Sequence, residues 1–122
     1  MAYVFNPLAR QSLQATPVPQ VYSVASASTI SIDAGLYDTV DVTALATGAT
    51  FSAPTGVINN AQKLVIRLKD NGVSRSLAWN AVFVSGGPAL PSATTSGKRT
   101  HLGFIYNSGT AEWFLVASAT QP

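Results

Sequence analysis

The sequence predicts an all-β domain, an antiparallel β-sandwich of jelly-roll-like form or a small barrel, with an extended N-terminal arm. About seven or eight short runs of β-branched or alternating residues are separated by Gly, Pro and Asn turn signals, which is typical of sandwiches and barrels. No run repeats apolar residues with the helical period. A chain of 122 residues suits one domain with a single core, so we expect the β-body to span residues 21–122.

Residues 1–20 are predicted to form an extended arm. Pro7, Pro17 and Pro19 interrupt helices and strands, and no regular apolar period lies between them. The arm also carries large apolar residues that a free tail would leave in water, so we expect it to bind another protein surface. The alternative is an ordinary disordered terminus. The expected contact residues of the arm are Tyr3, Val4, Phe5, Leu8 and Leu13.

Three short strands are expected in the first half of the chain. Residues 21–32 are β-branched, small and partly alternating, and Ala34-Gly35 ends this run. Residues 37–45 alternate and form the second strand, and residues 50–53 form a short third one.

Residues 63–83 predict a β-hairpin. Asn71-Gly72 stands between two alternating runs, and both residues tolerate the positive φ of a two-residue type I′ turn. That turn places the apolar face of the hairpin on the core. It leaves Lys63, Arg67 and Lys69 on the solvent-exposed face of an antiparallel sheet. The expected cross-strand pairs are Leu68 with Arg75, Ile66 with Leu77 and Leu64 with Trp79.

A second hairpin is expected after a long Gly- and Pro-rich loop over residues 85–97. Its strands cover residues 100–106 and 112–117, with Ser108-Gly109 at the turn. The expected inner pairs are Phe104 with Trp113 and Leu102 with Leu115.

The outer side of this second hairpin is too apolar to face water. Another layer of the same subunit or an oligomer interface is expected to cover it. The register places Gly103 opposite Phe114 and His101 opposite Val116, with Ile105 beside Glu112. The candidate interface residues are His101, Ile105, Phe114 and Val116.

Charge is sparse and unevenly placed. Charged residues make up 10% of the chain, against roughly a quarter in an average soluble domain, and seven bases against five acids give a net charge of +2. So weak a field, with no aromatic residues interleaved among the bases, argues against nucleic-acid binding. Acids gather in the first half and bases in the second. Opposite signs that meet across a subunit boundary would steer assembly, whereas scattered surface charge contributes little.

No membrane segment or disulfide is expected. The first residues lack the basic stretch and long apolar core of a signal peptide, and no later run is long and apolar enough to cross a bilayer. The chain has no cysteine, which excludes a disulfide framework and a thiolate site and fits a reducing compartment.

Residues suited to catalysis are few. His101 is the only histidine, no Gly-x-Ser-x-Gly elbow supplies a nucleophile, and strand spacing puts Asp38 and Asp41 on opposite faces. One histidine without cysteine cannot form a usual zinc site, and Asp70-Asn71-Gly72 lacks the other ligands of a calcium loop. We therefore expect no enzymatic activity, no cofactor and no metal.

Two short motifs occur in the second half of the chain. They are Arg75-x-Leu77-x-Trp79-Asn80 and Tyr106-Asn107-x-x-x-x-x-Trp113. With the residues around them, over residues 37–117, they resemble a β-domain that recurs in tailed-bacteriophage virion proteins, both small structural proteins and segments of tail fibres.

This resemblance implies a capsid decoration, or cement, protein on the surface of the virion, assembled in the bacterial cytoplasm. Such proteins are commonly homotrimers seated where capsomers meet, so the implied partners are the major capsid protein and other copies of the chain, with no nucleic acid and no membrane. The arm would hold the capsid or the adjacent protomer, for example by adding a strand to a sheet edge, while the β-body bridges subunits.

The same resemblance leaves open a tail-fibre or receptor-binding module that binds cell-surface glycans. Its candidate contacts are Trp79, Trp113 and the loop over residues 85–97. Both tryptophans fall on inner faces in the expected registers, which favours core packing. A depolymerase is the enzymatic alternative, and the sparse catalytic inventory of the sequence disfavours it.

Overall fold

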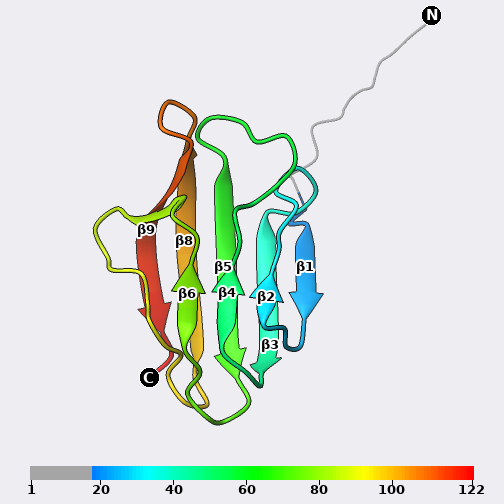
Figure 1. Ribbon diagram of the computed structural model, residues 1–122, viewed down its shortest axis with the longest axis vertical. Coiled ribbons are helices and arrows are strands. Elements are labelled where there is room, and N and C mark those ends of the chain that lie inside the picture. Colours follow the sequence, from blue (N-terminus) through cyan, green and yellow to red (C-terminus); the bar gives the residue numbers. More distant parts are fainter. Residues whose placement is uncertain (1–17) are drawn as a thin grey trace, which may run out of the picture.

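The structure is a computed structural model that describes residues 18–122, and these residues confirm the all-β prediction (Figure 1). Strands form two layers, a six-stranded sheet and a three-stranded sheet that lies in front of it in this view. No helix occurs within the described range. The expected contact residues of the arm, Tyr3, Val4, Phe5, Leu8 and Leu13, lie outside the described residues.

Nine strands make up the two layers. The six-stranded sheet has the order β1-β3-β5-β8-β9-β7, and the three-stranded sheet has the order β2-β4-β6. The strands are β1 Val21–Val24, β2 Thr29–Ile30, β3 Thr39–Leu45, β4 Ala49–Phe51, β5 Lys63–Asp70, β6 Leu77–Trp79, β7 Phe83–Ser85, β8 Arg99–Asn107 and β9 Glu112–Thr120.

The first six strands alternate between the layers. β1, β3 and β5 are parallel neighbours in the six-stranded sheet, and β2, β4 and β6 are parallel neighbours in the three-stranded sheet. Each connection therefore carries the chain from one layer to the other, and successive passes stack side by side. The hairpin of β8 and β9 then pairs with β5, and β7 lies at the far edge beside β9.

The core lies between the layers, and an aromatic group joins them. Phe51 of β4 stacks on Trp79 of β6, with ring centroids 4.3 Å apart. Trp79 also contacts Phe83 of β7 and Phe104 of β8, which belong to the other layer. Aromatic pairs of this kind add to the gain from apolar burial, so Trp79 helps to hold the small sheet on the large one.

The hairpin predicted over residues 63–83 is wrong in its pairing. β5 pairs with β3 and β8, whereas β6 pairs with β4 in the other layer. The segment after β5 redirects the chain, because the Asp70 carboxylate accepts a hydrogen bond from Gly72 N (2.9 Å) and Asn71 N donates to the Leu45 carbonyl (3.0 Å). Alternation fixes which face of a strand is buried, but not which strand lies beside it. The predicted inward face of β5 is confirmed by the burial of Leu64, Ile66 and Leu68.

The expected antiparallel arrangement holds only for β5, β8 and β9. The other five strand pairs are parallel. Parallel neighbours normally need a long crossover, often a helix. Between β1, β3 and β5 the crossover is a very short strand of the opposite layer, whereas β2, β4 and β6 are connected through the longer strands β3 and β5. The parallel strands β7 and β9 are connected through β8 of the same sheet. The turn signals of the sequence do not reveal these crossovers. For the same reason, the single strand expected over residues 21–32 is divided into β1 and β2, in different layers.

The second hairpin is confirmed, but its register differs by two residues from the prediction. Phe104 faces Leu115 and Tyr106 faces Trp113. The connection between the strands has four residues, 108–111, and Ala111 takes a positive φ of 56°. This even shift leaves the side chains of Phe104, Trp113 and Leu115 on their predicted faces, and they remain buried. The register changes by one residue between Gly103 and Phe104, so that Gly103 faces Ala117.

Candidate interaction surface

We call the side of the six-stranded sheet that points away from the three-stranded sheet the outer face. Its side chains come from alternate positions of the strands, next to residues that point into the core. Val65 of β5 and Val116 of β9 are 37% and 50% exposed there. These exposed valines show that no described segment fully covers the outer face at β5 and β9.

One end of the outer face is apolar. Ile105 of β8 and Phe114 of β9 are directly opposite each other. Together with Val116 they line an open depression of ≈ 520 Å³, and we call these three residues the apolar cluster. The remaining lining residues are Asn60, Ala61, Gly86, Tyr106 and Asn107.

The structure brings together three of the four candidate interface residues and separates the fourth. Val116 joins Ile105 and Phe114 because the register shifts between Gly103 and Phe104, which leaves Val116 without a partner on β8. The predicted pairing of His101 with Val116 is therefore wrong. His101 faces Ala119 on β9 and Arg67 on β5, so it lies towards the charged end of the outer face.

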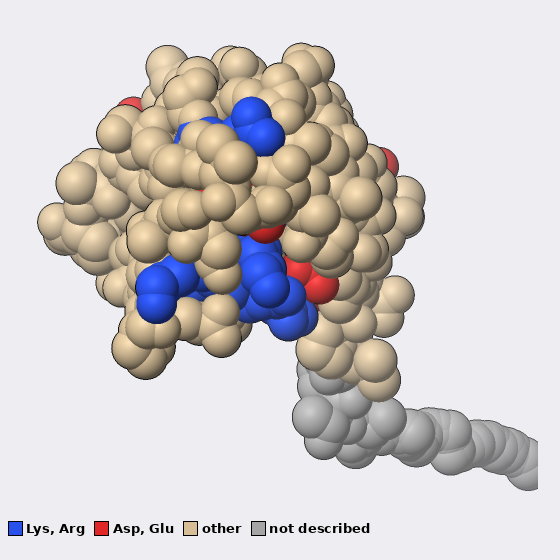
Figure 2. All heavy atoms as spheres, turned by 90° about the horizontal axis from the view of Figure 1, so that it is seen from below, with Lys and Arg blue, Asp and Glu red and all other residues tan. Residues whose placement is uncertain are grey.

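The other end of the outer face carries cations. Arg67 and Lys69 of β5 lie beside Arg99 of β8, and we call these three residues the basic cluster. Asp41 of β3 lies between the two arginines, with Oδ1 at 3.2 Å from Arg99 Nη1 and Oδ2 at 3.9 Å from Arg67 Nη1. Figure 2 looks at the end of the molecule where β5 ends and β8 begins, and it shows Lys and Arg side chains gathered beside carboxylates.

The sequence does not predict the contact between Asp41 and Arg99. They are 58 residues apart, and their contact depends on β5 lying between β3 and β8. The only signal available was alternation, which places Asp41 and Arg67 on the unburied sides of their strands. Strand order was needed to bring them together.

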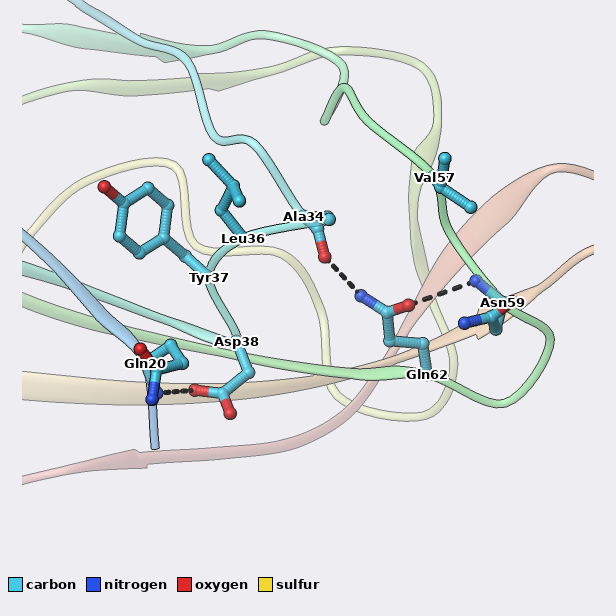
Figure 3. A pocket seen from close by; sticks show the side chains of 9 residues that line it. Gln20, Ala34, Leu36, Tyr37, Asp38, Val57, Asn59 and Gln62 are labelled. Carbon is cyan, nitrogen blue, oxygen red and sulfur yellow. Dashed lines mark hydrogen bonds between the residues drawn. The ribbon is translucent and has the colours of Figure 1, made fainter. Parts of the chain in front are cut away.

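A second depression, of ≈ 290 Å³, lies where the connections before β3 and after β4 meet (Figure 3). Several of its polar groups bond to neighbouring loops. The side chain of Gln62 donates from Nε2 to the Ala34 carbonyl (2.6 Å) and accepts from Asn59 N (3.1 Å). Gln20 N donates to Asp38 Oδ1 (3.0 Å). These bonds tie loops together, and the arrangement contains no nucleophile and base in contact.

Asp70 is the buried carboxylate of the described chain, and it organises the long connection between β7 and β8. Its Oδ1 accepts hydrogen bonds from Gly72 N (2.9 Å) and Gly97 N (2.7 Å), and its Oδ2 accepts one from Thr94 Oγ1 (2.6 Å). Burial raises the pKa of Asp70, but these hydrogen bonds and the charge of Arg75 outweigh it, so the pKa lies below its ordinary value. A carboxylate saturated in this way has a structural role.

Residues 18–122 contain no group of three or more His, Asp or Glu side chains that could hold a metal ion. Asp38 and Asp41 do not share a site, since Asp38 lines the depression of Figure 3 and Asp41 lies on the outer face. Within the same range, no helix is long and apolar enough to cross a membrane. The outer face is therefore the surface on which the candidate residues gather.

No protein-family model, curated protein or solved structure matches the chain.

Proposed function

We propose that this protein is a structural protein of a tailed-bacteriophage virion, a capsid decoration or cement protein that binds the outer shell and bridges capsid subunits. The observation that carries the proposal is the apolar cluster on the outer face, where Val116 is 50% exposed and Ile105 and Phe114 are half-buried around an open depression. Exposed apolar patches on a folded body commonly mark protein interfaces.

Three further features support the proposal. The sequence resembles phage virion β-domains over residues 37–117. The polar side chains of the described loops are bonded mainly to neighbouring loops, as expected of a structural part. The two layers share one core, and we infer that they act as a rigid β-sandwich that presents the outer face. The proposal includes a homotrimer, contact with the major capsid protein through residues 1–20, a place on the capsid surface and no enzymatic activity.

The glycan-binding alternative has less support. Trp113 is only 1% exposed, so its ring cannot stack on a sugar in this conformation. Trp79 stacks on Phe51, and its indole Nε1 donates to the Pro91 carbonyl (2.8 Å). Both tryptophans pack in or against the core, which matches the inner positions expected from the sequence.

The first test is the copy number of the protein per particle, measured by quantitative mass spectrometry of purified virions against the major capsid protein. A decoration protein gives a number that scales with the capsid lattice. A handful of copies would instead place the protein on the tail or at one vertex and support the fibre alternative.

The second test is binding to particles that lack the protein. Phe114→Asp puts a charge into the apolar cluster and is expected to weaken binding at least about tenfold, because an unpaired charge would be buried in the interface. Val57→Asp is the matched control, since Val57 is 81% exposed and lies at the depression of Figure 3. Equal loss in both variants, or none in either, would count against the outer face. Circular dichroism of both variants separates loss of binding from loss of folding.

A further inference from the structure

We infer that the outer face binds an acidic protein surface, with carboxylates of the partner on the basic cluster and an apolar side chain of the partner in the depression at the apolar cluster. This inference rests on the proposed function, because it describes the chemistry of the capsid surface that the protein would bind. The inference also assigns a role to the basic cluster, whereas the proposed function was argued from the apolar cluster alone.

The basic cluster has more cationic donors than its own chain satisfies. One carboxylate, Asp41, serves two guanidinium groups. Arg99 is within hydrogen-bond distance of it, but Arg67 is 3.9 Å away, and the buried Nε of Arg67 has no hydrogen-bond partner among the described residues. Lys69 makes no ion pair within this part of the chain. The buried Nε is out of reach of a partner, but the Arg67 side chain is 37% exposed, and its exposed guanidinium N–H groups are well suited to carboxylates.

The two halves of the face form one continuous surface. The positions of β8 between Arg99 and Ile105 on this face are His101 and Gly103, and the residues opposite them on β9 are Ala119 and Ala117. These residues are mostly small, so a partner can approach both halves at once. A partner that buries the apolar cluster also excludes water from the edge of the basic cluster, which strengthens charged hydrogen bonds there.

A second copy of the chain packed face to face does not complement this face. If two copies pack face to face about a two-fold axis along the strands, the basic cluster meets the basic cluster. If the axis runs across the strands, the basic cluster meets the apolar cluster and its cations lose water without gaining an anion. Charge complementarity therefore points to a different protein whose surface is acidic.

A nucleic acid fits less well than an acidic protein. The chain has a net charge of only +2, and no aromatic residue stands among the three cations of the basic cluster. Single-strand binders combine cations with aromatic rings on which bases stack. Phe114 lies at the other end of the outer face, beside Ile105.

The test measures binding of the full chain to phage particles that lack this protein, for the wild type, Arg67→Gln, Lys69→Gln and the control Val57→Asp. Val57→Asp changes the net charge by the same amount as each Gln variant, but away from the outer face. We expect each Gln variant to bind about three- to tenfold more weakly in about 0.05 M salt, and the difference to shrink in about 0.3 M salt, since screening weakens exposed charge pairs. The control is expected to bind like the wild type.

The outcomes separate the inference from the proposed function. Wild-type protein that does not bind the particles overturns both. Wild-type binding that neither Gln variant weakens, with the same salt dependence in all, overturns only the acidic-partner inference. A change of oligomeric mass in Arg67→Gln, measured by analytical ultracentrifugation, would assign the basic cluster to contact between copies and overturn it too. Binding of a short oligothymidylate at physiological salt, lost in Arg67→Gln, would assign the face to nucleic acid.

Discussion

Arg99 of β8 donates a hydrogen bond from Nη1 to Oδ1 of Asp41 on β3, at 3.2 Å and across the whole width of β5. The contact joins residues that are 58 positions apart and spans the boundary between the stacked parallel strands and the C-terminal hairpin. It therefore links the two parts of the six-stranded sheet through side chains as well as through the backbone.

Asp41→Asn tests the contribution of this link. The substitution keeps the shape of the side chain but removes its charge, and both partners are only partly buried, with side-chain exposures of 17% and 24%. We expect a loss of about 0.5–1 kcal/mol in the free energy of unfolding, as is common for ion pairs that remain accessible to solvent. Urea denaturation at low and high salt checks this, and a loss that does not shrink with salt would mean that charge is not its cause.

Asp70→Asn is expected to be more damaging. The Asn side chain offers a donor where Oδ2 now accepts from Thr94 Oγ1, and it also loses the charge that strengthens the bonds from Gly72 and Gly97. A loss of about 1–3 kcal/mol is expected, because Asp70 is only 2% exposed. Thermal unfolding of Asp70→Asn and Asp41→Asn under the same conditions compares the two losses of stability. Equal losses would contradict the expectation that Asp70 stabilises the fold more than Asp41 does.

The pH dependence of stability follows from the same carboxylate. The pKa of Asp70 in the folded protein lies below its ordinary value of 3.8, so the folded state binds the proton less readily than the unfolded chain does. The stabilisation is fully present above the unfolded pKa and is lost as the pH falls through the folded pKa. Urea midpoints measured between neutral pH and about pH 2 are expected to fall less steeply in Asp70→Asn than in the wild type.

Trp79→Phe tests the attachment of the long connection between β7 and β8. The variant keeps an aromatic ring against Phe51 but removes the Nε1–H that donates to the Pro91 carbonyl at 2.8 Å. We expect a loss of about 1 kcal/mol in stability and faster hydrogen exchange at the backbone amides of residues 85–97. Unchanged exchange in this loop would show that the Trp79 hydrogen bond does not hold it.

Gly56→Ala and Gly72→Ala form a matched pair. Both glycines have positive φ, 87° and 104°, so alanine strains the backbone at each. A Cβ at Gly72 meets nothing within 4 Å, whereas one at Gly56 would collide with the Asp33 carboxylate and with Gly35 N. Gly72→Ala is expected to cost about 1–2 kcal/mol and Gly56→Ala clearly more, measured by chemical denaturation. The reverse order would refute the close approach of the loops at Gly56.

The sequence was sufficient to predict the faces of strands but not their neighbours. Leu64, Ile66 and Leu68 are buried as alternation requires, and the C-terminal hairpin forms where its pattern placed it. The turn at Asn71-Gly72 misled the pairing because its local chemistry also suits a bend into another layer, where Asp70 and the Leu45 carbonyl hold it. Local signals could not distinguish these two outcomes.

In the candidate surface, too, the face of each residue could be predicted but its neighbours on other strands could not. Ile105, Phe114 and Val116 could be predicted as outer residues because a two-residue shift in register preserves the face. The ion pairs of Asp41 with Arg67 and Arg99 could not be predicted, because they depend on the strand order β3-β5-β8. Order in a sheet is decided by non-local packing, which leaves no mark in a single sequence.

The position of the C-terminal hairpin between β5 and β7 has a consequence for biosynthesis. β7 leaves the ribosome before β9, the strand with which it pairs, and until β8 and β9 follow, β5 and β7 both present open edges. Open edges of this kind promote aggregation. The six-stranded sheet is therefore completed only when the last strand has been translated, and we expect nascent chains that stop at residue 98 to depend on chaperones and to be degraded rapidly, unlike the full-length product.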